Sequence, residues 1–292
     1  MANGSSSPAA WTDGWFWSLD GLRLHYRDYS GRTDRPTLLC LPGLTRSARD
    51  FAAFAERYAG EWRVVCPDLR GRGESAYAKD PLSYVPLTYL QDLNALLDAA
   101  RITRFVGVGT SLGGLLVMLL TATHREAIAG AILNDIGPIV EPAGQARLRS
   151  NVGRSASWPT WMHAARDLHE RNVASYPDWH ITDWLAFAKR LCRLTPTGRI
   201  VFDYDARIAD AFRLPGSDAG LDLWTAFDAL AKVPVLSVRG ALSDVLSKAT
   251  QAAMVARHPR LHTVTLPRIG HAPTLSEAKA AAAVRELLAA VR

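Results

Sequence analysis

Gly109-Thr110-Ser111-Leu112-Gly113-Gly114 is the stretch of this sequence that decides the fold. It follows an apolar run at residues 105–108, which has the composition of a buried strand, and the apolar run that begins at Leu112 is typical of a helix. A sharp turn between a strand and a helix raises its serine above the edge of a sheet. Glycines fit at 109 and 113 because side chains there would collide with their neighbours. The pattern predicts that Ser111 is a nucleophile.

Strand-like and helix-like segments alternate on both sides of this turn. Strands are predicted at Thr37–Leu41, 63–66, 105–108, 131–133, 235–238 and Leu261–Leu266. Helices are predicted at 47–58, around 90–97, from 112, at 247–257 and from 276. Near the start, residues 15–18 and 22–28 flank Asp20-Gly21, which predicts a hairpin. The alternation is typical of a mostly parallel sheet that helices cover on both faces.

The alternation stops between about Gly137 and Asp222, where the apolar positions are mostly aromatic and helix-like. These aromatic positions include Trp158, Trp161, Trp179, Trp184, Phe187 and Phe202. The change indicates a segment inserted into an α/β core. We therefore expect a core at residues 14–136 and 222–292, a helical cap at residues 137–221 and a flexible tail at residues 1–13.

Composition and charge exclude several classes of protein. Of the 292 residues, 48% are hydrophobic and 21% are charged, which excludes a disordered chain and a coiled coil. The 34 Lys and Arg residues exceed the 28 Asp and Glu residues and give a net charge of +6. The basic residues are dispersed and adjoin no recognition motif, so we expect no nucleic-acid partner.

The sequence also predicts a protein that has no membrane partner. No apolar run reaches the length of about 18 residues that a membrane-spanning helix needs. Residues 1–10 lack the basic and apolar regions of a secretion signal. The three cysteines cannot form a closed disulfide framework. We therefore expect a cytoplasmic protein.

A serine nucleophile needs a base and a carboxylate that orients the base. Among the eight histidines, His271 stands out because it follows the predicted strand Leu261–Leu266, in a loop before the last helix. Asp244 and Asp135 each lie just past a predicted strand, and the chain order serine, aspartate, histidine fits either one. We expect Asp244 to orient His271, with Asp135 as the alternative acid.

Acyl chemistry also needs hydrogen-bond donors for the negative charge that develops on the substrate oxygen. The backbone N–H of Leu112, at the start of a helix, is one expected donor. The loop after Thr37–Leu41 supplies the other, and we expect the N–H of Leu44 because Gly43 allows that loop to approach closely. The sequence has no metal-binding motif, and we expect neither a metal nor a cofactor.

Together these motifs resemble the α/β-hydrolase superfamily over nearly the whole chain after residue 13. The matching pieces are Leu41-Pro42-Gly43-Leu44, Asp68-Leu69-Arg70-Gly71-Arg72-Gly73-Glu74-Ser75, Gly109-Thr110-Ser111-Leu112-Gly113-Gly114, Ser243-Asp244 and Gly270-His271. The resemblance implies an α/β-hydrolase fold, with an eight-stranded, mostly parallel sheet and a helical cap inserted after the sixth strand. It also implies a structural role for Asp68 and Arg70. Pro42 departs from the pattern, since members often carry histidine before the oxyanion-loop glycine.

The resemblance implies a Ser-Asp-His hydrolase of the esterase-like branch. We expect it to cleave carboxylic esters of small to medium apolar or aromatic substrates through an acyl-enzyme. Haloalkane dehalogenases and epoxide hydrolases of the same superfamily use an aspartate nucleophile, so Ser111 argues against both. The aromatic residues of the cap either line an apolar pocket over Ser111 or only hold the cap helices together.

Other activities on the same fold stay open, because one fold hosts many functions. They are a C–C bond hydrolase of ring-fission products, a lactonase, a hydroxynitrile lyase or perhydrolase, and a ligand receptor without catalysis. In each case we expect a small molecule as the binding partner and a monomer or a homodimer.

Overall fold

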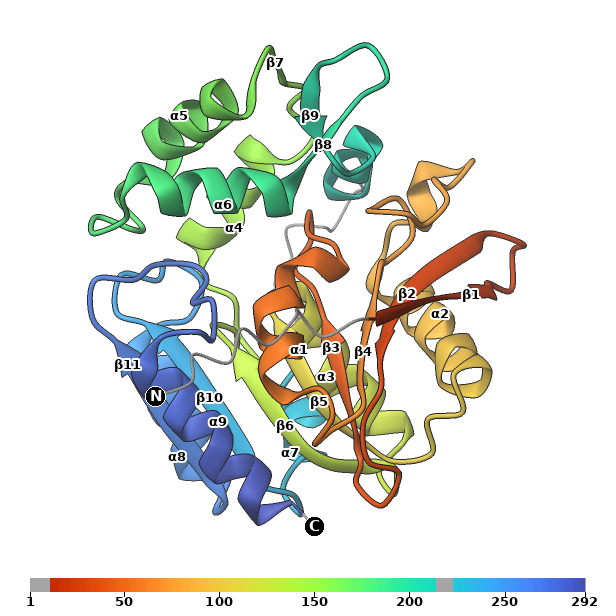
Figure 1. Ribbon diagram of the computed structural model, residues 1–292. Helices are drawn as coiled ribbons and strands as arrows, with labels where there is room; N and C mark the ends of the chain where they lie inside the picture. Colours follow the sequence, from red (N-terminus) through yellow and green to blue (C-terminus); the bar gives the residue numbers. More distant parts are fainter. Residues whose placement is uncertain (1–10, 214–222, 292) are drawn as a thin grey trace, which may run out of the picture.

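The computed structural model describes residues 11–213 and 223–291 (Figure 1). The strands of its main sheet are β1 (Trp11–Trp17), β2 (Arg23–Tyr29), β3 (Thr37–Leu41), β4 (Val64–Pro67), β5 (Phe105–Thr110), β6 (Ile128–Asn134), β10 (Val235–Gly240) and β11 (Leu261–Leu266). Within the described residues this sheet has eight strands, in the order β1-β2-β4-β3-β5-β6-β10-β11. The β1–β2 and β2–β4 pairs are antiparallel and the other pairs are parallel. The predicted α/β-hydrolase fold is confirmed.

Helices cover both faces of the sheet. They are α1 (Ala52–Tyr58), α2 (Pro86–Ala99), α3 (Leu112–Thr123), α7 (Trp224–Asp228), α8 (Lys248–Arg257) and α9 (Ala278–Ala290). Every residue of β3, β4, β5 and β6 is buried, which explains why these strands are continuous apolar runs. Side chains alternate between the faces: Leu39 and Leu41 pack with residues of α2 and α3, whereas Leu38 and Cys40 pack with residues of α1 and α9.

The predicted hairpin is formed by β1 and β2, on either side of Asp20-Gly21. The expected tail at residues 1–13 is wrong for its last three residues, which belong to β1. Trp11 pairs with Tyr29 across the hairpin, and the Arg27 guanidinium lies 4.2 Å from the Trp11 ring centroid. These contacts extend the strand beyond the expected start. Residues 1–10 lie outside the described residues.

The segment between β6 and β10, described for residues 137–213, is called the inserted segment below. Its elements are α4 (Pro142–Asn151), β7 (Ser157–Trp158), α5 (Trp161–Asn172), α6 (Ile181–Leu191), β8 (Cys192–Leu194), β9 (Ile200–Phe202) and the short 3₁₀ helix η3 (Ala206–Arg213). The sequence did not predict the small antiparallel sheet β7-β9-β8. Trp158, Tyr176, Trp184 and Phe187 form a core inside the segment, so most of its aromatic residues hold its own helices together.

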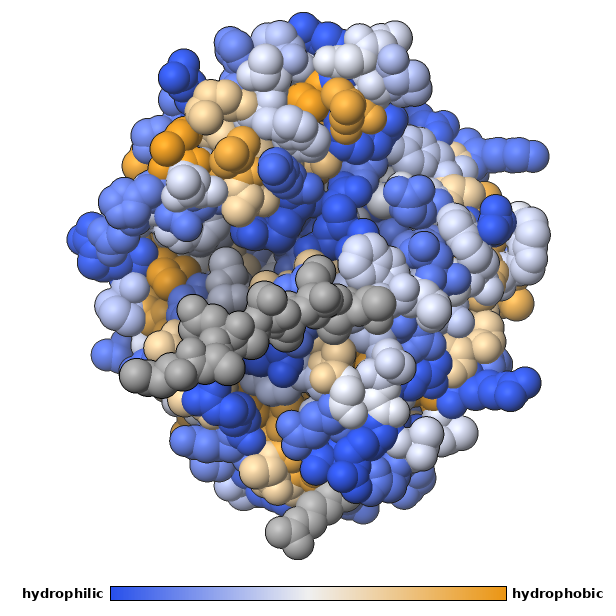
Figure 2. All heavy atoms as spheres, viewed as in Figure 1, coloured by the Kyte–Doolittle hydropathy of each residue, from blue (hydrophilic) through white to orange (hydrophobic). Residues whose placement is uncertain are grey.

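The inserted segment lies over the carboxyl ends of the parallel strands of the main sheet (Figure 1). Polar contacts join it to the core: Arg49 pairs with Asp203, and Arg190 pairs with Asp50 at 3.5 Å. On the face shown in Figure 2, hydrophilic residues gather between the segment and the core. None of the described helices has the length and apolar character that a membrane crossing requires.

Candidate active site

Ser111 occupies the turn between β5 and α3, with φ 54° and ψ −120°. Residues other than glycine rarely adopt this region of positive φ, and such strain is concentrated at functional sites. The flanking glycines are required by space. A Cβ at Gly113 would overlap the carbonyl oxygen of Leu41, and a Cβ at Gly109 would overlap the backbone of Gly113.

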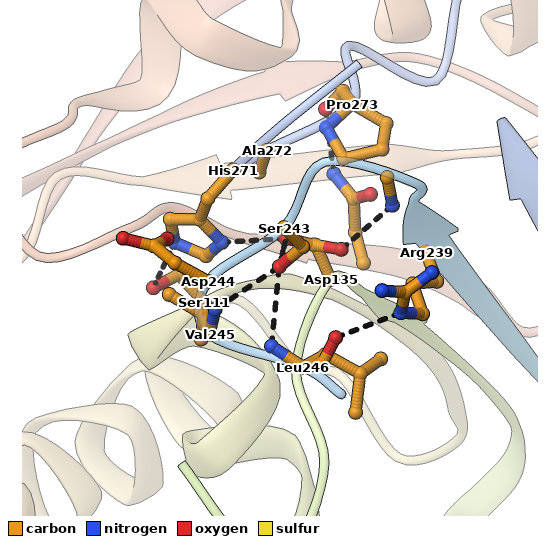
Figure 3. A network of polar contacts seen from close by, with 12 residues as sticks. Ser111, Asp135, Arg239, Ser243, Asp244, Val245, Leu246, His271, Ala272 and Pro273 are labelled. Carbon is orange, nitrogen blue, oxygen red and sulfur yellow. Dashed lines mark hydrogen bonds and ion pairs between the residues drawn. The ribbon is translucent and has the colours of Figure 1, made fainter. Parts of the chain in front are cut away.

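His271, from the loop after β11, connects Ser111 to an acidic residue (Figure 3). Its Nε2 lies 2.9 Å from Ser111 Oγ, and its Nδ1 lies 2.8 Å from Asp135 Oδ2. Ser111 is 8% exposed and Asp135 is fully buried. The structure therefore brings together the predicted nucleophile and the predicted base, in the arrangement that activates a serine.

Asp135 immediately follows β6 and also has a positive φ, of 56°. Its Oδ1 accepts a hydrogen bond from the Gly240 N–H at 2.8 Å, and its Oδ2 accepts one from Ser243 Oγ at 2.6 Å. The Ser243 hydroxyl in turn accepts hydrogen bonds from two backbone amides of its own loop. These bonds fix the carboxylate so that Oδ2 faces His271.

The prediction that Asp244 orients His271 is wrong. Asp244 instead accepts two hydrogen bonds from Arg147 of α4, at 2.5 Å from Nε and 2.8 Å from Nη2. Burial alone would raise the pKa of Asp244, but the Arg147 guanidinium outweighs it and the pKa is lowered. The reason lies in the partners of the two carboxylates: Arg147 of the inserted segment engages both oxygens of Asp244, whereas Asp135 keeps an oxygen facing His271. Asp135 is therefore the carboxylate that contacts His271.

The loop after β3 lies beside the serine, as the sequence predicts. A Cβ placed on Gly43 would be 3.7 Å from the Cβ of Ser111. The carbonyl oxygen of Leu44 accepts a hydrogen bond from Nε of the buried Arg72 at 2.8 Å, which holds the loop in place. Neither the Leu44 N–H nor the Leu112 N–H donates to another residue within the described ranges. Both amides therefore lack an acceptor within the described part of the chain.

The motif at residues 68–75 makes contacts that hold the loop after β3 in place. Asp68 accepts hydrogen bonds from the Ala48 N–H at 2.6 Å and contacts His25 Nδ1 at 2.7 Å. Arg70 pairs with Asp92 at 2.7 Å. These contacts agree with the structural role that the resemblance implies for Asp68 and Arg70. The part of Arg72 in holding Leu44 was missed, because the sequence pattern does not reveal where a buried guanidinium points.

A cavity of about 160 Å³ opens onto Ser111 and His271. Its apolar wall includes Leu148, Val152, Leu168, Phe187, Leu191 and Phe202. Four arginines also line it: Arg46, Arg147, Arg154 and Arg171. The pocket thus combines an apolar wall, which was one of the two alternatives, with a cationic wall. In the described part of the chain, no three His, Cys, Asp or Glu side chains are grouped to hold a metal ion.

The loop that carries His271 is held from two sides. From the inserted segment, Tyr176 donates a hydrogen bond to the Ala272 carbonyl at 3.0 Å, and the Ser175 carbonyl accepts one from Gly270 at 2.6 Å. From the sheet, the Asn134 side-chain amide donates to the Pro273 carbonyl at 2.8 Å. The position of His271 therefore depends on both the core and the inserted segment.

Replacing Ser243 with alanine tests the support of Asp135. We expect kcat/KM for a good substrate to fall about tenfold, the effect of losing one hydrogen bond to a charged group. The exposed Ser276→Ala is the matched control. An unchanged kcat/KM in a folded Ser243→Ala protein would contradict this role.

Comparison with known proteins agrees with this fold. The family model described as the alpha/beta hydrolase family matches residues 38–284. The 3-hydroxybutyrate-oligomer hydrolase of Cupriavidus necator is 32% identical, over 86% of this chain and 88% of the relative. An alpha/beta hydrolase of Novosphingobium aromaticivorans, solved as a crystal structure, is 54% identical with a TM-score of 0.92, over 97% and 99% of the two chains.

A structure of an esterase from Mycobacterium tuberculosis shares the fold, with a TM-score of 0.69 at 22% identity over 98% of this chain and 93% of the other. The match of the family model covers most of the sequence, including the serine turn and the histidine loop. On the sequence, the fold and these similarities, the chain belongs to the alpha/beta hydrolase family.

Proposed function

We propose that the protein is a serine esterase that cleaves carboxylic esters through an acyl-enzyme. The observation that carries this proposal is the row of contacts from Ser111 through His271 to Asp135, at the edge of a cavity. In this reading Asp135, and not Asp244, is the acid of the catalytic triad. The same three residue types in the same arrangement serve acyl transfer on unrelated folds.

Each residue has a defined role in the proposed reaction. Ser111 Oγ attacks the ester carbonyl while His271 Nε2 takes its proton. Asp135 accepts the Nδ1–H bond, which keeps the correct tautomer and stabilises the imidazolium. The backbone N–H groups of Leu44 and Leu112 receive the oxyanion. His271 then protonates the leaving alcohol, and a water that His271 deprotonates hydrolyses the acyl-serine.

The inserted segment acts as a cap in this proposal. Of the cavity lining, Leu148, Leu168 and Phe187 come from its helices α4, α5 and α6, whereas Ser111 and His271 come from the core. A cap that closes over the serine excludes bulk water and limits the size of the acyl group. We place it at residues 137–221, of which 137–213 are described.

The size and composition of the cavity favour esters of short to medium length. A volume of about 160 Å³ leaves little room for a long acyl chain in this arrangement of the cap. The similarity to a 3-hydroxybutyrate-oligomer hydrolase suggests oligoesters of short hydroxy acids as substrates. These molecules present small apolar units that match the Leu168 and Phe187 wall.

The test combines a substrate series with labelling of the nucleophile. We expect turnover of chromogenic phenyl esters to peak at short or medium acyl chains, and oligomers of 3-hydroxybutyrate to be cleaved. An organophosphonate should label Ser111, as read by mass spectrometry of the digested protein. A folded protein that is labelled at Ser111 but turns over neither esters nor lactones would overturn the proposal and favour C–C bond hydrolysis.

A further inference from the structure

We propose that the substrate of this site carries a free carboxylate, and that Arg154 and Arg171 bind this carboxylate at the mouth of the cavity. The inference rests on the proposed ester hydrolysis and specifies the kind of ester. It starts from the charges on the cavity wall. Among the described residues that line the cavity, four are arginines and none is aspartate or glutamate. A neutral apolar ester could not form an ion pair with these arginines.

Two of the four arginines already form ion pairs with acidic side chains of the protein. Arg147 makes its bidentate pair with Asp244, a contact between the inserted segment and the core. Arg46 pairs with Asp50 at 3.1 Å, and its guanidinium lies 4.6 Å from the ring centroid of Phe187. Each of these side chains has a partner that fixes its position, so their charges are largely compensated.

The other two arginines are available to a ligand. Within residues 11–213 and 223–291, the Arg154 side chain makes no hydrogen bond or ion pair. Arg171 pairs with Asp167 one helical turn away on α5, and the Arg171 side chain is 40% exposed. An exposed pair of this kind contributes little to stability, so a second carboxylate competes for it easily. Arginine is suited to this task because its planar fork binds carboxylates with two parallel hydrogen bonds.

The cavity has an apolar part and a charged part. Val152, Leu168 and Phe187 are buried, whereas Arg154 and Arg171 are exposed. The apolar portion of the substrate therefore packs inward, and the carboxylate stays at the opening, where its desolvation costs least. An acid-ended oligoester has this distribution of groups, because its units are apolar and its charge is confined to one end.

The test compares a free acid with a neutral substrate of the same length. The probes are the trimer of 3-hydroxybutyrate and the same trimer with its terminal carboxylate replaced by a carboxamide. We expect the wild-type protein to favour the acid. Arg154→Gln and Arg171→Gln should each raise KM for the acid by about tenfold, as the loss of one charge-assisted contact predicts. Their kcat values, and KM for the carboxamide, should change little.

Arg166→Gln is the matched control, because Arg166 is exposed on the same helix as Arg171 and does not line the cavity. Salt of about 0.5 M should weaken the turnover of the acid and leave that of the carboxamide nearly unchanged. Equal turnover of acid and carboxamide by the wild-type protein, or equal losses on both substrates in the two variants, would overturn the inference. Ser111-dependent turnover of neutral esters would then leave the proposed function intact, whereas absent turnover on every ester would remove it.

Discussion

Replacing Ser111 with alanine is expected to abolish ester turnover, with a fall in kcat of about 10⁶-fold, the loss found when the nucleophile of a serine hydrolase is removed. Without Oγ no acyl-enzyme forms, and His271 has no proton to accept from the nucleophile. The free amides of Leu44 and Leu112 would remain, so a small rate above the uncatalysed reaction should persist. Steady-state rates on a chromogenic ester, with active-site titration of the wild-type protein, measure this effect.

The variant should stay folded, because alanine places its Cβ where serine does and the flanking glycines are unchanged. Circular dichroism and thermal unfolding check this. The Ser276→Ala variant again serves as the control, because it is the same substitution at an exposed serine outside the site. A Ser111→Ala protein that keeps substantial turnover, or that an organophosphonate still labels at another residue, would show that a different group is the nucleophile.

Asp135→Asn should lower kcat by about 10⁴-fold, the size of loss seen when the acid of such a triad becomes an amide. The amide oxygen can still accept a hydrogen bond from the Gly240 N–H, so we expect the variant to stay folded. The NH₂ group facing Nδ1 would favour the tautomer of His271 that carries its proton on Nε2. That tautomer cannot take the proton of Ser111.

Asp244→Asn is the natural counterpart, because Asp244 also follows a strand and is the acid that chain position favours. Its carboxylate is engaged by Arg147, so we expect a change of no more than a few-fold in kcat and a modest loss of thermal stability. The two variants are compared at the pH of maximal activity, with melting temperatures alongside. A severe loss in Asp244→Asn with an active Asp135→Asn would reverse the assignment.

The contrast between these two aspartates shows what the sequence could and could not predict. The serine turn and the histidine loop are local patterns, and the structure places Ser111 and His271 in contact as their positions suggest. The choice of acid depends on long-range contacts, since Arg147 of the inserted segment engages Asp244, and no local pattern encodes such a contact. One signal was present: Asp135 directly follows its strand, as Ser111 does, whereas Asp244 lies well past Gly240, the last residue of β10.

Other features were missed for related physical reasons. The strands of the small sheet β7-β9-β8 have two or three residues each, too few to carry the alternation by which strands are recognised. The support of Leu44 by Arg72 joins two loops that are distant in the sequence. The pairing of Arg147 with Asp244 likewise depends on how the inserted segment folds back onto the core.

Tyr176 limits which substitutions in the cavity wall this protein can tolerate as it evolves. The residue belongs to the cavity wall, and its hydroxyl also holds the Ala272 carbonyl next to His271. Replacing Tyr176 with a smaller residue enlarges the cavity but also removes the hydrogen bond that holds the loop of His271. We therefore expect a wider substrate range to come with a lower rate. Mutations at Tyr176 should show strong epistasis with the histidine loop. Leu191 lines the cavity with an apolar side chain that forms no hydrogen bond, so divergence in specificity can proceed there at lower cost.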